Sequence, residues 1–447
     1  MKPLKRSFSS IAILLITLGS MAILFWLGFY KNFDAEIIPQ NTDGIVIIDV
    51  KNIRNHGIIT YLKSPSHWPF FSNEKKKKSF IDFSEYKIET PYYLAIFHLK
   101  NQPISQWHSV AKLENETEFE KAILKEHFKK EKLKNGMSSY FSKSLGIYII
   151  KHSNQILISK IDDTQKAIAV KTAEELFLKK HFLDANTLQN IIDTPSAITF
   201  WIKKNAFLEK DALVTVNFKG QDIIAEGLLQ LNPKYKKTTL FTQNPSAVLS
   251  LGFDFEMIRS QTIFKNHLVQ INKLVGFDID SIMVHHPSKT ELIFNEMVEK
   301  THSAISYDYD DDFNPIKKVV VHTSREPSFC FSVQTENSQK IYTYLKTKNA
   351  IDNHQFFVNF PLAPTQTSVK NNTLVFEANL PKTRKLKPLL SKIGYLRMNF
   401  NNLQPQDWRF IIGRNKNLEL LKSFKTFKMD LNLEKNTGHF KAHMTAK

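Results

Sequence analysis

Two stretches of the sequence resemble each other and decide the fold: GIVIIDVKNIR at residues 44–54 and AVLSLGFDFEMIR at residues 247–259. In each stretch an apolar run, which favours a buried strand, ends at an aspartate, and a segment follows that favours a short helix. The two aspartates, Asp49 and Asp254, are 205 positions apart. The sequence therefore predicts that one strand–helix element occurs twice in the chain.

Further short matches continue in the same order, at offsets between 196 and 223 residues. Similarity in a fixed order is the signature of a repeated structural unit. The offset grows around SYDYDDDFNP, residues 306–315, whose composition is typical of a surface loop. We expect a tandem duplication with copies at 31–236 and 237–447, joined by NPKYKK at 232–237, and an inserted loop in the second copy.

Short alternating strands separated by polar turns fill most of each copy, together with a few amphipathic helices. Helices are expected to begin at Asn115 and near Asn337, to cover residues 163–180, and to include residues 386–393 in spite of Pro388. The predicted fold class is α+β: an N-terminal transmembrane helix followed by two tandem duplicated domains of mainly antiparallel sheet with packed helices.

The N-terminus has the features of an uncleaved membrane anchor. Lys2, Lys5 and Arg6 precede an uncharged run at residues 7–30, whose apolar part is long enough to cross roughly 30 Å of bilayer. The preceding cations place the N-terminus in the cytoplasm. We expect residues 1–30 to be a cytoplasmic tip and anchor in a bacterial inner membrane, and residues 31–447 to be periplasmic.

The composition is strongly basic: 61 Lys and Arg stand against 43 Asp and Glu, a net charge of +18. Such a surface favours anionic lipid or an acidic cell-wall polymer, although dispersed lysines are also typical of ordinary solubility. Nucleic acid is a poor partner for an exported chain. One aromatic and basic segment is the candidate interaction loop, and it contains Trp68, Phe70, Phe71, Lys75, Lys76, Lys77 and Lys78.

Motifs of enzyme chemistry are missing from the sequence. It has no glycine-rich phosphate loop, no G-x-S-x-G elbow and no H-E-x-x-H pair, so we assign no catalytic residue and expect no cofactor. Its one cysteine, Cys330, is interpreted as a strand residue. A hydrolase built on an unrecognised carboxylate pair, such as Asp49 with Asp254, remains the enzyme alternative to simple helix capping by these two residues.

The acidic segment begins like a calcium loop, because Asp308, Asp310 and Asp312 alternate. The pattern then fails, since Phe313 stands where glycine is required and Val319 where the bidentate glutamate should be. We therefore interpret it as a solvated acidic loop and expect no metal site.

The segment IPQNT at 38–42, followed by an apolar strand, resembles the opening of bacterial envelope proteins of unknown function that have an N-terminal anchor and tandem α+β repeats. GFDI at 276–279 is similar to a recurrent segment of that family, whereas the first copy has FID at 80–82 without the glycine. The resemblance implies an envelope location and supplies no activity.

These observations predict a non-enzymatic, membrane-anchored envelope protein that acts as an interaction or scaffolding module for a protein partner. The alternative is a module that binds an anionic or amphiphilic ligand, either lipid or cell-wall polymer.

Overall fold

The computed structural model describes residues 31, 33, 36–63, 85–103, 105–161, 163–236, 238–255, 268–270, 272–273, 275–381, 386–389, 392–408, 413, 416–435 and 437–447. The chain divides into two compact units. Unit 1 comprises Met1–Lys203 and Leu213–Gly220, and unit 2 comprises Lys204–Ala212 and Gln221–Lys447. The predicted copies at 31–236 and 237–447 stay a prediction.

The predicted fold class is wrong. In the part of the chain that the structure describes, the protein is mostly antiparallel sheet, in place of the predicted α+β domains of sheet with packed helices. No helix in the described part of the chain is long and apolar enough to cross a membrane. Residues 1–30, where the transmembrane helix was predicted, lie outside the described residues. The balance was misjudged because several long strands carry polar residues, which in the sequence looked like turns and loops.

Unit 1 contains an antiparallel sheet in the order β8–β1–β2–β3–β7–β6–β5–β4. Its strands are β1 (Thr42–Asp49), β2 (Tyr93–Leu99), β3 (Trp107–Lys112), β4 (Lys129–Lys132), β5 (Ser138–Ser142), β6 (Ile147–His152), β7 (Gln155–Lys160), β8 (Ile198–Ile202) and, outside that order, β9 (Ala212–Lys219). Its helices are α2 (Val50–Lys63), α3 (Glu116–Lys125), α4 (Lys166–Ala173) with a π-helical turn at Glu174–Leu178, and α5 (Ala185–Ile192).

Two apolar clusters hold unit 1 together. In the larger one, α4 and α5 pack against the sheet. Phe97 and Ile150 of the sheet and Leu188 of α5 are almost completely buried there. The smaller one packs α3 through Phe119 and Ile123. As predicted, α3 begins after Asn115, whose side-chain oxygen accepts a hydrogen bond from the Glu118 backbone N–H at 3.1 Å.

Unit 2 contains an antiparallel sheet in the order β15–β16–β14–β13–β12–β18–β19–β20–β10. Its strands are β10 (Asp222–Leu229), β12 (Leu249–Phe253), β13 (Lys289–Tyr309), β14 (Pro315–Gln334), β15 (Gln366–Lys370), β16 (Thr373–Ala378), β18 (Gly394–Asn399), β19 (Phe424–Glu434) and β20 (Thr437–Ala446), with a separate pair of β11 (Thr242–Gln243) and β17 (Lys387–Pro388). Its helices are α8 (Asp280–Met283) and α9 (Ser338–Thr347), and 3-10 turns lie at Pro405–Asp407 and Lys416–Ser423.

The core of unit 2 has two apolar clusters as well. One packs Phe400 and Trp408, with the 3-10 segments near them, against the sheet around Val248. The other packs α9 against β16 through Ile341 and Leu374. The first cluster includes Phe294 of β13 and the second includes Phe331 of β14, so both strands are packed into the core before they project from the sheet.

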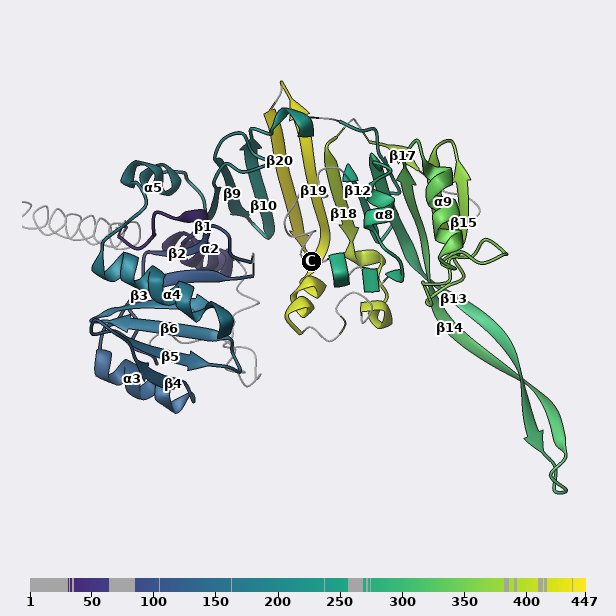
Figure 1. The fold of residues 1–447 in the computed structure, drawn as a ribbon, viewed down its shortest axis with the longest axis horizontal. Coiled ribbons are helices and arrows are strands. Elements are labelled where there is room, and N and C mark those ends of the chain that lie inside the picture. Colours follow the sequence, from purple (N-terminus) through teal and green to yellow (C-terminus); the bar gives the residue numbers. More distant parts are fainter. Residues whose placement is uncertain are drawn as a thin grey trace, which may run out of the picture. The chain divides into compact units, whose positions relative to one another are not determined.

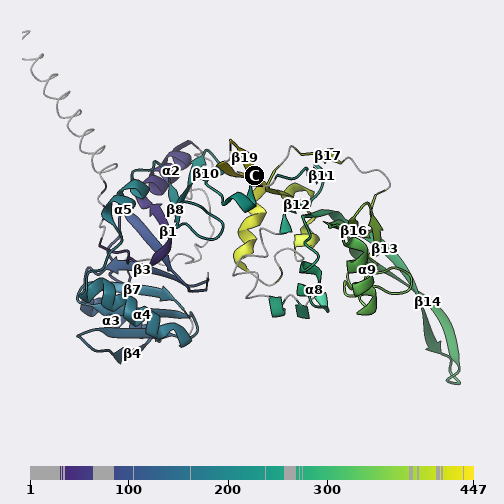
Figure 2. The ribbon, with the colours of Figure 1, turned by 45° about the horizontal axis from the view of Figure 1, so that its top comes forward.

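β13 and β14 are far longer than their neighbours, at 21 and 20 residues. They run out of the sheet of unit 2 as a two-stranded ribbon, drawn in green in Figure 1, and the turned view in Figure 2 shows the same projection. In the pairing order of unit 1, β2 and β3 occupy the positions corresponding to β13 and β14, yet they have only 7 and 6 residues. The projecting ribbon is therefore an elaboration that the sheet itself does not require.

Two local predictions in unit 2 need correction. The loop expected at residues 306–315 is confined to a turn at 310–314, because β13 continues to Tyr309 and β14 starts at Pro315. The helix expected at 386–393 is also absent from the described residues there: Lys387–Pro388 form β17, which pairs with Thr242–Gln243. Pro388 cannot donate a backbone hydrogen bond, so an edge pair suits it better than a helix interior.

Candidate functional site

The projecting ribbon, here called the arm, consists of residues 296–309 and 315–328. Its strands pair continuously from Glu296 opposite Ser328 to Tyr309 opposite Pro315. β12 pairs with β13 only as far as Phe294, and β16 pairs with β14 only from Phe329. Within the described residues, no pairing extends the sheet beyond the outer edges of the arm.

One face of the arm is apolar and open to solvent. Residues opposite each other on paired strands share a face, so Ile305 with Val319 and Tyr307 with Lys317 lie on the same side, followed by Tyr309 towards the tip. The exposed fractions on this face, which we call the apolar face, are 57% for Ile305, 61% for Tyr307, 64% for Tyr309, 64% for Val319 and 59% for Val321. Contiguous exposed apolar surface of this kind typically marks an interaction site.

The other face of the arm is more polar. It carries Ser306 opposite Lys318 and Asp308 opposite Ile316, with His302 opposite His322 nearer the body of the unit. Lys318 lies 3.4 Å from the Asp308 carboxylate, and both side chains are largely exposed. Neighbouring positions of one strand, such as 307 and 306, therefore place their side chains on opposite faces of the arm, so that one can serve as a control for the other.

The tip of the arm is a turn organised by Asp310. Its carboxylate accepts hydrogen bonds from the backbone N–H groups of Asp312 at 3.0 Å and Asn314 at 2.7 Å. The backbone of Phe313 has a positive φ of 61°, and its side chain is 84% exposed. Asp310 therefore has an architectural role in this turn. No cluster of metal-ligating side chains is found among the described residues.

Arg325 fixes the base of the arm to a neighbouring 3-10 turn. Its Nε donates to Asp407 Oδ1 at 2.7 Å and its Nη2 donates to Asp407 Oδ2 at 2.8 Å, while Nη2 also donates to the Met297 carbonyl at 3.0 Å. The hydrogen bonds with Asp407 raise the pKa of Arg325, although burial acts in the opposite direction. Asp407 is only 2% exposed, so this pair is a fixed attachment point.

Glu326 makes a second attachment at the base. The buried carboxylate accepts hydrogen bonds from His302 Nε2 at 2.6 Å and Asn379 Nδ2 at 3.0 Å. Burial alone would raise the pKa of Glu326, but the hydrogen bonds from Asn379, His302 and Ser324 lower it below the usual value. The arm is therefore anchored firmly at one end and unsupported by described residues at the other.

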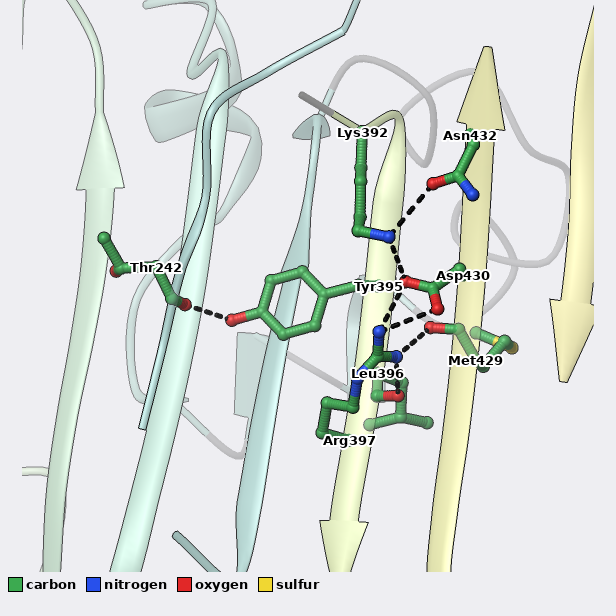
Figure 3. Close-up of polar contacts among 8 residues, drawn as sticks. All are labelled: Thr242, Lys392, Tyr395, Leu396, Arg397, Met429, Asp430 and Asn432. Carbon is green, nitrogen blue, oxygen red and sulfur yellow. Dashed lines mark hydrogen bonds and ion pairs between the residues drawn. The ribbon is translucent and has the colours of Figure 1, made fainter. Parts of the chain in front are cut away.

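A polar network lies on the sheet of unit 2 and joins residues of β18 and β19 (Figure 3). Asp430 Oδ1 accepts from Lys392 at 2.6 Å and from Arg397 Nη2 at 2.6 Å, and Arg397 also donates to the Met429 carbonyl at 2.8 Å. Lys392 donates to Asn432 Oδ1 at 3.0 Å. These groups satisfy one another, so the network is suited to fixing β18 against β19 rather than to binding a ligand.

Beside this network, Tyr395 packs tightly on a glycine. Its hydroxyl donates to the Thr242 carbonyl at 2.5 Å (Figure 3), and burial raises the pKa of Tyr395. A Cβ atom at Gly252 would lie 2.5 Å from Tyr395 Cε1 and 2.6 Å from Phe241 Cδ1. The close approach of the two rings to the strand explains why glycine stands at position 252.

In unit 1 a small cleft of about 160 Å³ lies beside Asp49, and Lys31, Tyr93 and Ser196 contribute to its lining. Asp49 accepts a hydrogen bond from the Asn52 backbone N–H at 2.8 Å and forms an ion pair with Lys31. The prediction that Asp49 caps the following helix is thus confirmed. Its carboxylate is fully engaged, which makes it a poor general base.

The remaining predicted residues fall elsewhere. The candidate interaction loop of Trp68, Phe70, Phe71, Lys75, Lys76, Lys77 and Lys78 lies outside the described residues. Asp254 is buried at the end of β12, and the predicted helix after it is not described. Cys330 is a half-buried residue of β14, as predicted, and is not part of a disulfide. The arm was missed, although the alternation of Ile305, Tyr307 and Tyr309 with polar residues is a strand signal.

No family model matches the sequence, and no curated protein matches it. Solved structures of TP0453 are similar to parts of the chain. Crystal form III has 10% sequence identity, covers 45% of this chain and 81% of that chain, and gives a TM-score of 0.29. Crystal form I has 9% identity, covers 78% of this chain and 92% of that chain, and gives a TM-score of 0.23. Similarity at these TM-scores supports no statement about function.

Proposed function

We propose that the chain is a non-enzymatic envelope protein that binds another protein through the apolar face of its arm. The observation that carries this proposal is the row of five apolar side chains, each more than half exposed, on a ribbon that projects from the sheet of unit 2. Covering these side chains would contribute on the order of 5 kcal/mol from apolar area. That is enough to make the arm the energetic centre of an interface.

The attachment of the arm supports a binding role. Arg325 and Glu326 hold its base through charge-assisted hydrogen bonds to Asp407 and Asn379, which limits the freedom that binding would have to remove. The engaged state of Asp49 argues against the hydrolase alternative at that position. Location in the envelope is proposed from the cations and the apolar run of residues 1–30 in the sequence.

The test is photo-crosslinking in intact cells with the full-length chain. A benzophenone-bearing residue is placed at position 307 on the apolar face or, as a matched control, at position 306 on the other face. We expect a discrete protein crosslink from position 307 and at least tenfold less product from position 306. Equal products from both positions, or none from either, would refute the proposed role of the apolar face.

A further inference from the structure

We propose that helix α2 of unit 1 rests on the surface of an anionic lipid bilayer through an exposed apolar stripe formed by Ile58, Ile59 and Leu62. This inference is separate from the proposed role of the arm, because it concerns another surface and another kind of partner. It uses the membrane anchor that the sequence predicts at residues 7–30.

The stripe lies on one side of α2 and is open to solvent. Residues three and four positions apart are neighbours on a helix surface, so Leu62 lies beside both Ile58 and Ile59. The exposed fractions are 50% for Ile58, 51% for Ile59 and 59% for Leu62. Three aliphatic side chains gathered in this way are typical of an interaction surface.

A different side of α2 holds the helix in unit 1. The ring of His56 stacks on Phe218 of β9, with the ring centroids 5.2 Å apart, and its Nε2 lies 3.1 Å from the Gly220 carbonyl oxygen. One turn earlier, Asn52 Nδ2 donates to the Ser196 carbonyl at 3.3 Å. Because these residues make the contacts with unit 1, the stripe is left free for an outside partner.

The start of α2 lies within reach of the predicted anchor. Lys31, the first described residue, forms an ion pair with Asp49, and Asp49 caps α2 through the backbone N–H of Asn52. The predicted span ends at Tyr30, and consecutive Cα atoms are about 3.8 Å apart. One residue and one ion pair therefore join the end of the span to the start of α2, which keeps this helix near the bilayer surface.

The charge of α2 suits an anionic surface. The helix contains Lys51, Arg54 and Lys63 and no acidic residue. Arg54 lies one turn before Ile58 and Lys63 one turn after Ile59, and both cations are exposed, so they flank the stripe. Long basic side chains can reach lipid headgroups while an apolar stripe enters the interface. The short connection to the anchor and the flanking cations together favour a bilayer as the occupant.

The experiment measures how deeply α2 lies in vesicles that contain the full-length chain. The vesicles hold equal amounts of phosphatidylglycerol and phosphatidylcholine, and a fluorophore is attached to Leu62→Cys or Gly57→Cys in a Cys330→Ser background. Position 57 is a matched control, because it lies about 140° around the helix from position 62 and a Cβ atom there meets nothing within 4 Å.

A nitroxide on the lipid acyl chains should quench the fluorophore at position 62 about fivefold more strongly than at position 57, because an interfacial helix buries its apolar side. Iodide in the water should quench the two positions in the reverse order. Equal quenching at both positions, or a chain that does not stay with the vesicles, would overturn the proposal.

Two further variants test the choice of occupant. Arg54→Gln with Lys63→Gln should reduce lipid quenching at position 62 to the level found in vesicles of phosphatidylcholine alone, and unchanged quenching would rule out anionic lipid. Ile58→Ser with Ile59→Ser should leave the thermal unfolding transition in detergent unchanged. A clearly lower transition would show that the chain itself covers the stripe. None of these outcomes bears on the role of the arm.

Discussion

Arg325 and Asp407 are 82 positions apart in sequence, and two hydrogen bonds of 2.7 and 2.8 Å join them at the base of the arm. Asp407 belongs to the turn at Pro405–Asp407, beside Trp408 of the apolar core. The pair therefore connects a projecting ribbon directly to the packed part of unit 2.

Removing the charge of Asp407 should destabilise this attachment. In Asp407→Asn the half-buried Arg325 guanidinium loses its ionic partner, and we expect a cost of about 2 kcal/mol. Urea unfolding of the full-length chain measures it. Glu419→Gln is the control, because Glu419 pairs with Lys422 on an exposed turn and should cost below about 0.5 kcal/mol. Equal costs for both variants would contradict the account.

Glu326 should make the base of the arm sensitive to acid. Its pKa is lowered in the folded state, so its stabilising contribution is complete above the ordinary value of 4.5 and is lost as the pH falls through the folded pKa. Hydrogen exchange of arm amides should accelerate in that acidic range. Glu326→Gln cannot titrate at this position and should show a flatter pH dependence, and an unchanged profile would count against the role of Glu326.

His108 should make unit 1 sensitive to acid at a higher pH than Glu326 does for the arm. Burial, with a smaller effect of His98, lowers the pKa of His108 to about 4 from 6.5. Its Nε2 lies 2.9 Å from the Gln102 oxygen and its Nδ1 2.8 Å from the Ser159 hydroxyl, which fits a neutral ring. Because the folded pKa is lowered, stability is complete above pH 6.5 and falls towards pH 4, by roughly 3 kcal/mol in total.

His98 gives a comparison of opposite sign. Its hydrogen bond with Asp43 raises the pKa of His98, so its contribution is complete below pH 6.5 and is lost as the pH rises through the folded pKa. Between pH 7 and 4, His108→Gln should therefore lose less stability than the wild type, and His98→Gln should lose more. Unfolding free energies across this range test both, and shifts in the same direction would contradict the assignment.

Two glycine substitutions should have opposite effects. In Gly252→Ala the added methyl meets Tyr395 and Phe241 well inside van der Waals contact, and overpacking should cost about 1 to 3 kcal/mol. Gly57 lies inside α2 with open space where a Cβ would be, so Gly57→Ala should stabilise by about 0.5 to 1 kcal/mol. Thermal unfolding of both variants checks the packing of Tyr395, and a neutral Gly252→Ala would disprove it.

Local signals in the sequence predicted several elements correctly. The capping residue Asn115 and the apolar spacing of Phe119 and Ile123 predicted α3. The apolar run ending at Asp49 predicted β1 and the capped start of α2. These features depend on neighbours in sequence, and for that reason the sequence shows them.

The arm carries a weaker local signal, the alternation of Ile305, Tyr307 and Tyr309 with polar residues. Asp308, Asp310, Asp311 and Asp312 dominate residues 306–315, and such composition is typical of loops. What makes the segment a strand pair is register across the ribbon, where Tyr309 meets Pro315 and Ile305 meets Val319. The spacing of Leu386 and Leu389 wrongly predicted a helix for a similar reason. β17 forms by pairing with Thr242–Gln243, which is far away in sequence.

Cysteine accessibility in intact cells tests the central claim most directly. In a Cys330→Ser background, single cysteines are introduced as Tyr307→Cys on the apolar face and Ser306→Cys on the other face, and both are also labelled in the diluted purified chain. The account predicts that labelling in cells is at least tenfold slower at position 307 than at position 306, and that the difference disappears on dilution. Equal labelling of both positions in cells would show that nothing covers the apolar face and would contradict the account.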